Sequence, residues 1–305
     1  MRRIQSGIVD LLVDPPEFVV REAAGLGRFA SRMRDDGWGR DQVLELPYVE
    51  LGYWYPQATR FQQLLGSKAA EPILQDGKRI LDVGSNTCWA SAMFAERGPR
   101  VVALDIASHE LQGLKTADWW FDGKGVYFDR VLGAMFDPVF ADDSFDAIFC
   151  SEVLHHNHRD NLRRTMREFH RILKPGGQVF VINEPVRSLR SPKFRPGRGE
   201  VAEYMGHEHV YMRSAYVRAA SKAGLDVELV APPSIGALNQ SAWSIDIKTP
   251  TRLVFQMALG HAVRRSRRLR RAYLAWRTYV DGVSLYMIAT KPEQASGRRS
   301  ELVVG

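Results

Sequence analysis

A glycine turn between acidic residues is the part of the sequence best suited to chemistry. The apolar run around Asp82 leads directly into Gly84 and small polar residues, a pattern that predicts a strand, a tight turn and a helix. Backbone amides of such a turn can bind a carboxylate or phosphate, and Gly84 lets a ligand approach where a Cβ atom would block it. A second apolar run ends at Asp105, at the interval expected for an acid that reaches two ribose hydroxyls. The pattern predicts an adenosine-containing ligand, and a βαβ unit without a ligand is the alternative.

The elements that must position these residues alternate between strands and helices. Seven strands are predicted, at residues 79–83, 101–105, 126–132, 145–150, 178–183, 226–230 and 283–290. This order predicts an α/β fold, Rossmann-like and doubly wound, with a mostly parallel seven-stranded sheet covered by helices on both faces. Ligands of such sheets bind at the carboxyl ends of the strands, where Gly84, Asp105 and His155 are expected.

Three segments lie outside this alternating pattern. A helix over residues 18–33 is expected to break near Gly25 and Gly27. The predicted organisation is an N-terminal helical cap (1–78), a main domain (79–292) with a helical insertion (232–282) before the last strand, and a flexible tail (293–305). Pro250 opens a long basic helix, predicted over 251–280, within that insertion.

Composition favours a cytoplasmic protein with one α/β core. The chain has 305 residues, of which 45% are hydrophobic and 25% charged, and no apolar run approaches the roughly 18 residues needed to span a bilayer. Acidic residues such as Asp10 and Asp14 interrupt any signal-peptide core. The two cysteines, Cys88 and Cys150, lie far apart in sequence and are expected to be buried thiols without a disulfide or zinc.

The basic charge is concentrated in one segment. The net charge is +7, and much of the excess lies between Arg264 and Arg277 and in the tail. Two interpretations stay open for this helix: a lid or homo-oligomer contact with a solvated basic face, or peripheral contact with anionic lipid or a phosphorylated carrier. Nucleic acid is a less favoured partner, because no RNA-binding module accompanies the helix.

Four motifs carry a resemblance to a known family. They are Ile80–Gly84, Val102–Asp105, Asp143–His156 and Leu173–Gly177, in the family's order and spacing. Each motif is weak alone, but together they make the sequence similar to class I S-adenosylmethionine-dependent methyltransferases, most closely the type 11 branch that includes quinone-biosynthesis enzymes. The resemblance covers about residues 79–185.

The resemblance implies S-adenosyl-L-methionine as cofactor and a role for each matching residue. Asp82 and Gly84 would hold its methionine part, Asp105 both ribose hydroxyls, and Ile106 would pack on the adenine. Family members often have an acid near the adenine edge, whereas this chain would use backbone groups there. The remaining implied cofactor contacts are Ser85, Asn86, Ala134, Met135 and Ser151. Glycines usual in the family are replaced by Asn86 and Cys88, and asparagine tolerates the left-handed backbone region better than most residues.

Two histidine clusters supply candidates for a catalytic base. Histidine titrates near neutral pH and can accept a proton from a hydroxyl acceptor. We predict His156 or His209 as the base, with His155 and His207 as the alternatives. A magnesium site built from His155, His156 and Glu184 is disfavoured because magnesium prefers oxygen ligands, so no metal is predicted.

These observations predict a methyltransferase that acts on a small or carrier-linked acceptor. O-methylation of a saccharide or polyketide-type hydroxyl is the favoured reaction. N- or C-methylation, an NAD-linked oxidoreductase and a non-catalytic scaffold that binds the cofactor are the alternatives. The oxidoreductase should show more of a glycine fingerprint, which Asn86 and Cys88 interrupt.

Overall fold

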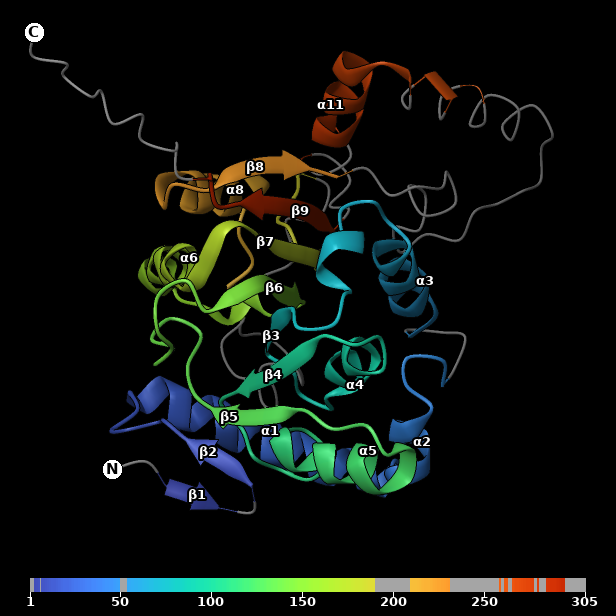
Figure 1. Ribbon diagram of the computed structural model, residues 1–305, viewed down its shortest axis with the longest axis vertical. Coiled ribbons are helices and arrows are strands. Elements are labelled where there is room, and N and C mark those ends of the chain that lie inside the picture. The colour runs from blue at the N-terminus through green and yellow to red at the C-terminus, as the bar shows by residue number, and fades with distance from the viewer. Residues whose placement is uncertain are drawn as a thin grey trace, which may run out of the picture.

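A nine-stranded sheet forms the centre of the computed structural model (Figure 1). The structure describes residues 3–5, 7–49, 54–189, 209–230, 258, 261–262, 265–276, 279 and 284–293. The strand order is β1-β2-β5-β4-β3-β6-β7-β9-β8. The pairs from β2 through β7 are parallel, whereas β1 with β2, β7 with β9 and β8 with β9 are antiparallel. The predicted α/β class and mostly parallel sheet are therefore confirmed.

The bounds of the elements follow the predicted alternation. The strands are β1 (Arg3–Gln5), β2 (Ile8–Asp10), β3 (Arg79–Val83), β4 (Arg100–Asp105), β5 (Asp129–Leu132), β6 (Phe145–Ser151), β7 (Leu173–Glu184), β8 (Asp226–Leu229) and β9 (Leu285–Thr290). The α-helices are α1 (Glu17–Asp35), α2 (Arg40–Leu44), α3 (Trp54–Leu65), α4 (Trp89–Ala95), α5 (Ala117–Lys124), α6 (Arg159–Ile172), α8 (Arg213–Lys222) and α11 (Arg267–Trp276). Short 3₁₀ turns occupy Glu71–Ile73, Leu114–Thr116 and Leu154–His156.

The predicted number of seven strands is wrong, because the N-terminal segment adds two strands to the sheet. The hairpin of β1 and β2 extends the edge, where β2 pairs in parallel with β5 and buries Ile8. Each of these strands has only three residues, too few to show an alternating pattern that sequence analysis could recognise. The first 78 residues are therefore not a purely helical cap.

The predicted break in the first helix is also wrong, because α1 is continuous. A Cβ atom on Gly27 would lie 2.7 Å from Nε2 of His109, in the loop after β4. That His109 nitrogen lies 3.1 Å from the carbonyl oxygen of Ala23, also in α1. Gly27 therefore lets α1 pack closely on this loop, which a helix-propensity argument alone cannot show.

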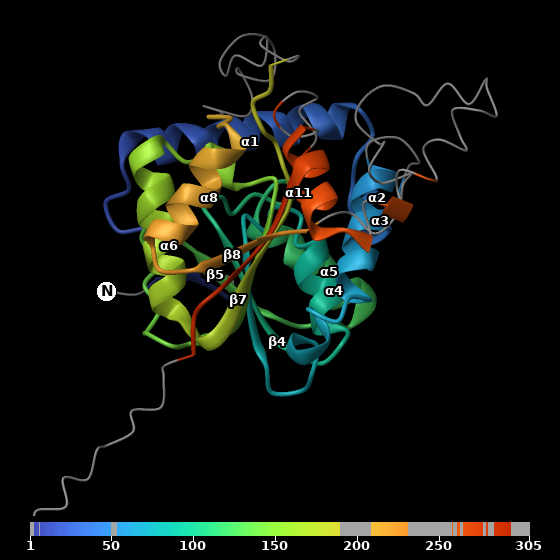
Figure 2. The ribbon, with the colours of Figure 1, turned by 90° about the horizontal axis from the view of Figure 1, so that it is seen from above.

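Helices cover both faces of the sheet, and α1 runs across the end of it (Figure 2). One face carries α3, α4 and α5, whose apolar residues pack in a cluster with Ile80 and Phe149. The other face carries α6 and α8, which pack with Leu81, Ile148 and Val179. Both cysteines are buried thiols, as predicted.

The basic helix predicted over 251–280 is not one continuous helix. Ser266 is not helical, and α11 begins after it, with the Ser266 hydroxyl accepting a hydrogen bond from the backbone N–H of Leu269 (3.3 Å). Most of the predicted insertion and the tail from residue 294 lie outside the described residues. In the part of the chain that is described, no helix combines the length and the apolar character needed to cross a membrane.

A cluster of aromatic side chains attaches α3 to the sheet. The Phe61 ring is fully buried, with its centroid 4.8 Å from that of Trp89, 5.1 Å from Phe94 and 5.4 Å from Phe149, all close to perpendicular. Such edge-to-face contacts add to the burial of apolar area. Phe61 is therefore the main anchor of α3.

We predict that Phe61→Ala lowers the free energy of unfolding by about 3–5 kcal/mol, because it leaves a cavity among three rings. Tyr127→Ala is the control, since that side chain is 72% exposed and should cost much less. Urea unfolding followed by circular dichroism measures both variants. Equal effects of the two substitutions would contradict the role of Phe61.

Candidate functional site

A cavity of about 800 Å³ lies at the carboxyl edge of the parallel strands. The ends of β3, β4 and β6, the turn after β5 and the inner face of α1 line it. Its volume falls within the range of about 300–1,000 Å³ usual for small-molecule sites. Figure 2 shows α1 running across this end of the sheet, and several residues of α1 line the cavity.

The turn after β3 has an unusual backbone. Gly84, Asn86 and Cys88 all have positive φ angles, of 68°, 46° and 58°. A Cβ atom at Gly84 would lie 2.3 Å from the side chain of Val153, so the glycine permits close packing of the turn after β6. Asn86 and Cys88 hold the left-handed conformation that family members reach with glycines, as predicted for Asn86.

The carboxylate of Asp105 connects the turns after β3 and β4. Its Oδ2 accepts a hydrogen bond from the backbone N–H of Asn86, and its Oδ1 accepts one from Ala107, both at 2.9 Å. Burial raises the pKa of Asp105, whereas these backbone amides and nearby His156 act to lower it. The backbone N–H of Ile106 also acts on this carboxylate, and a carboxylate has about four acceptor positions, so Asp105 can still accept a hydrogen bond from a ligand hydroxyl.

Asp82 is the second buried acid of the cavity. Its Oδ2 accepts a hydrogen bond of 2.5 Å from the hydroxyl of Ser91 in α4. Burial raises its pKa to about 7, partly offset by that hydrogen bond, and nearby Asp105 raises it further. A positively charged ligand group beside Asp82 would therefore favour its ionised form.

Within the described residues, three polar atoms of the cavity wall have no hydrogen-bond partner although they are buried. They are Oε1 of Glu22, Oδ1 of Asn86 and Oγ of Ser151, each on a residue that lines the cavity. Unpartnered buried oxygens are rare in folded proteins, because each loses its contact with water without compensation. Their common place in the wall of one cavity fits a ligand that carries several hydrogen-bond donors.

The structure brings all of the predicted cofactor contacts to this cavity. The lining includes Asp82, Gly84, Ser85, Asn86, Asp105, Ile106, Ala134, Met135 and Ser151. They come from neighbouring strands and the turns that follow them, as the order of the sheet requires. The residues present therefore fit an adenosyl cofactor.

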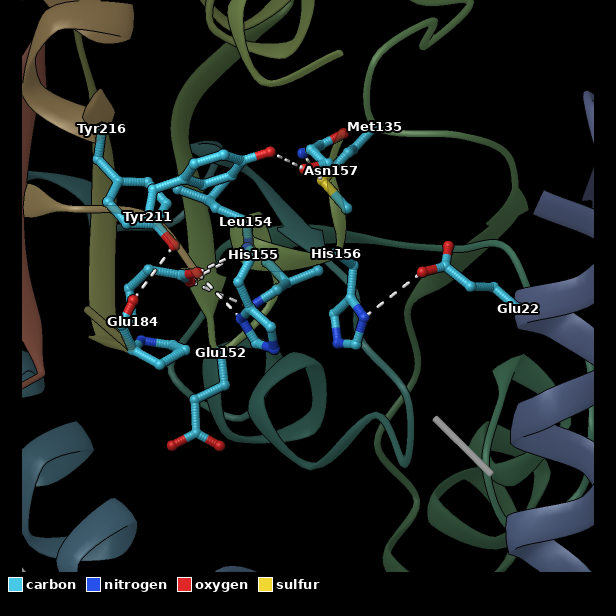
Figure 3. Close-up of polar contacts among 12 residues, drawn as sticks. Glu22, Met135, Glu152, Leu154, His155, His156, Asn157, Glu184, Tyr211 and Tyr216 are labelled. Atoms are coloured by element: carbon cyan, nitrogen blue, oxygen red, sulfur yellow. Dashed lines mark hydrogen bonds and ion pairs between the residues drawn. The ribbon is translucent and has the colours of Figure 1, made fainter. Parts of the chain in front are cut away.

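His155 has a structural role. Its ring nitrogen Nδ1 lies 3.0 Å from Oε1 of Glu184, a fully buried acid at the end of β7 (Figure 3). The same carboxylate accepts hydrogen bonds from the backbone N–H groups of Val153, Leu154 and His155 at 2.7–3.2 Å. His155 is not among the residues that line the cavity.

His156 is the one of the described histidine candidates that lines the cavity. Figure 3 shows its ring directed toward Glu22 of α1, with Nδ1 3.6 Å from Oε1 of Glu22. His209 donates its backbone N–H to the carbonyl oxygen of His155 (2.7 Å), and its ring packs at 5.1 Å from that of His158, outside the cavity lining. His207 lies outside the described residues.

Sequence analysis missed several cavity residues supplied by α1 and α3. Glu22 lies in α1, and Gln57 in α3 donates a hydrogen bond of 3.0 Å to Glu152, which follows β6. The signal for Glu22 was present: it falls on the helix face that also carries Val19, Leu26 and Met33, as an acid among apolar residues. Gln57 and Glu152 have no comparable local signal.

No group of three or more histidine, cysteine, aspartate or glutamate side chains is arranged to hold a metal ion within the described part of the chain. His155, His156 and Glu184, the residues of the alternative magnesium site, are not arranged as such a group. Glu184 is instead occupied by backbone amides and by His155.

Comparisons with known proteins agree with this geometry. Residues 81–181 match a family model described as a methyltransferase domain. The biotin biosynthesis bifunctional protein BioHC of Cellvibrio japonicus is 34% identical over 134 residues, 42% of this chain and 24% of that protein. A demethylmenaquinone methyltransferase of Corynebacterium glutamicum is 32% identical over 108 residues, 35% of this chain and 42% of that protein. The matches thus span less than half the length of these two relatives.

Among solved structures, the [4+2]-cyclase SpnF has the same fold, with a TM-score of 0.51 and 20% identity over 79% of this chain and 83% of that chain. The fold and the family match define the class of the domain. Residues 81–181 are thus similar to methyltransferase domains, and S-adenosylmethionine is the cofactor that this similarity indicates.

The raised pKa of Asp82 predicts a pH-dependent effect of Asp82→Asn on stability. Between about pH 4 and 7 the unfolded chain ionises this group while the folded protein keeps it protonated, so rising pH weakens folding. Asparagine does not ionise, so the stability of the variant does not fall with rising pH for this reason. Its free energy of unfolding relative to wild type should therefore rise by about 2–3 kcal/mol between pH 5 and pH 8, without ligand.

Urea unfolding of both proteins at several pH values measures this difference. Asp129→Asn is a suitable control, because Asp129 begins β5 and is exposed. A stability difference between wild type and Asp82→Asn that does not change with pH would show that Asp82 is already ionised in the folded protein.

Proposed function

We propose that this protein transfers a methyl group from S-adenosylmethionine to a hydroxyl oxygen of a small-molecule acceptor. The observation that carries the proposal is the convergence of Asp82, Asp105 and the unpartnered oxygens of Asn86 and Ser151 on one cavity. The family match of residues 81–181 supports methyl transfer in general.

The cavity residues divide between the parts of the cofactor. Asp82 and the Gly84 turn would hold the methionine part, and Asp105 would accept both ribose hydroxyls. Ile106 with the backbone of Ala134 and Met135 would hold the adenine. When bound, the cofactor supplies a methyl group on a positively charged sulfur. The protein then has to align an acceptor with that group and exclude water.

His156 is the residue we propose as the general base. Its imidazole lines the cavity with Nδ1 3.6 Å from Oε1 of Glu22, beyond hydrogen-bond distance, so a ring nitrogen is free to take a proton. The hydroxyl proton of the acceptor would move to that free nitrogen as the oxygen–methyl bond forms. His209 and His155 are poor candidates, because neither lines the cavity.

The chemistry of the wall favours a neutral acceptor of the saccharide or polyketide type. The part built by α1 combines aromatic rings such as Phe18 and Phe29 with the carboxylate of Glu22. Acidic side chains outnumber basic ones in the described lining, where Arg32 is the one lysine or arginine. Such a wall disfavours an anionic group inside the cavity, so the phosphate of a carrier-linked acceptor would remain outside. Contacts of the basic segment with a membrane or with a second copy stay predictions.

We predict that Asp105→Ala weakens binding of S-adenosylhomocysteine by about 1.5–3 kcal/mol, because it removes hydrogen bonds to a charged group. Isothermal titration calorimetry measures the dissociation constant, with Asp129→Ala as the exposed control. NADH titrated in parallel should not bind. Wild-type protein that binds NADH and not S-adenosylhomocysteine would identify an oxidoreductase instead.

We predict that His156→Gln leaves binding of S-adenosylhomocysteine within about threefold of wild type but slows methyl transfer about 10²–10⁴-fold, the usual contribution of a general base. Transfer of a radiolabelled methyl group to a panel of saccharide and polyketide hydroxyl compounds measures the rate. His158→Gln is the control, since His158 is exposed and not part of the lining. Equal rates for the two variants would remove His156 from the mechanism.

A further inference from the structure

The carboxylate of Glu22 is buried in the cavity wall with one oxygen that has no hydrogen bond. Glu22 is 8% exposed, and its Oε1 is buried without a hydrogen bond. The nearby ring nitrogen Nδ1 of His156 lies 3.6 Å away, too far for a hydrogen bond. Because the residue lines the cavity, its carboxylate can accept a hydrogen bond from a ligand there.

An apolar part of the cavity wall lies one helical turn before Glu22. Phe18 and Val19 of α1 pack in one cluster with Ile106, Ala134 and Phe136, and the rings of Phe18 and Phe136 have centroids 5.7 Å apart. Residues three and four positions apart share one side of a helix, so Glu22 lies on the same side of α1 as Phe18 and Val19. This apolar part of the wall and the carboxylate together fit a flat apolar ring with a hydrogen-bond donor at its edge.

The turn after β5 cannot supply that acceptor from a side chain. Residues 133–136 contain no acid, and the next residue, Asp137, is paired with Arg164 at 2.7 Å and does not line the cavity. The adenosyl group has three donor groups: two ribose hydroxyls and the amino group on its purine ring. In the proposed function Asp105 accepts the two hydroxyls, which leaves the amino group without an assigned carboxylate partner.

We propose that Glu22 recognises the exocyclic amino group of the adenine, so that the N-terminal helix selects the base of the cofactor. This inference rests on the proposed function, because it requires an adenosyl ligand in the cavity. It makes α1 part of the cofactor site, and it gives a reason for the unpartnered oxygen at this position.

The test compares S-adenosylhomocysteine with its deaminated analogue, S-inosylhomocysteine, in which a carbonyl oxygen replaces the amino group. Wild-type protein should bind the analogue much more weakly, because Glu22 would face that oxygen. In Glu22→Ala, binding of S-adenosylhomocysteine should fall roughly ten- to hundredfold, whereas binding of the analogue should not fall. Calorimetry gives all four dissociation constants.

Glu22→Gln provides a readout that a purely structural role would not change. The glutamine amide can donate to the carbonyl oxygen of the analogue, so this variant should bind the analogue more tightly than wild type does. Glu17→Ala is the matched control, because Glu17 lies on the same helix with its side chain 85% exposed. It should leave both affinities unchanged.

The outcomes separate this inference from the proposed function. One outcome is that wild type binds S-adenosylhomocysteine while the Glu22 variants change the affinities for both compounds by the same factor, or change neither affinity. In that case Glu22 does not recognise the adenine, and only this inference fails. If wild type binds neither compound, the proposed function fails with it. Circular dichroism of each variant excludes unfolding as the cause of lost affinity.

Discussion

The site depends on one buried carboxylate that joins two strand ends. Asp105 accepts hydrogen bonds from the backbone of Asn86, after β3, and of Ala107, after β4. Left-handed conformations at Asn86 and Cys88 each cost roughly 1–2 kcal/mol relative to the right-handed region. Charge-assisted hydrogen bonds of the kind that Asp105 makes offset part of that cost. The turn is therefore shaped by the protein itself, with its amides and oxygens oriented before a ligand arrives.

A second buried carboxylate performs the same task at the end of β7, three strands along the sheet from β4. Glu184 holds three successive backbone amides after β6 and the ring of His155 (Figure 3). This fixes Val153 against Gly84 and leaves His156 in the cavity wall. The two acids thus position the two loops that face each other across the strand ends, and neither acid needs a metal ion to do so.

Sequence analysis succeeded where the information was local. The strand–turn–helix around Gly84 and the acid at the end of the next strand each lie within a few residues, so the order of residue types was enough to predict these elements. It could not separate His155 from His156, which are adjacent and chemically identical. Glu184, 29 residues after His155, determines which of the two faces the cavity.

The strands β1 and β2 were missed because three residues carry no periodicity. Residues of α1 were missed as site residues because only tertiary packing brings that helix over the strand ends.

The acidic residues of the cavity affect which ligands it binds most tightly. Glu22, Asp36, Asp82, Asp105 and Glu152 line it, against Arg32 as the one lysine or arginine among the described lining residues. Burial is the main cause of the raised pKa of Asp82 and of Asp105, and for Asp82 the nearby carboxylate of Asp105 adds to it, because like charges disfavour one another's ionised forms. A ligand with a positive charge relieves this repulsion, and a neutral one does not. In the proposed function, the methyl donor carries a positive charge and its demethylated product does not. The carboxylates would therefore bind the donor more tightly than the product. The acids would then serve both the capture of the cofactor and its release after transfer.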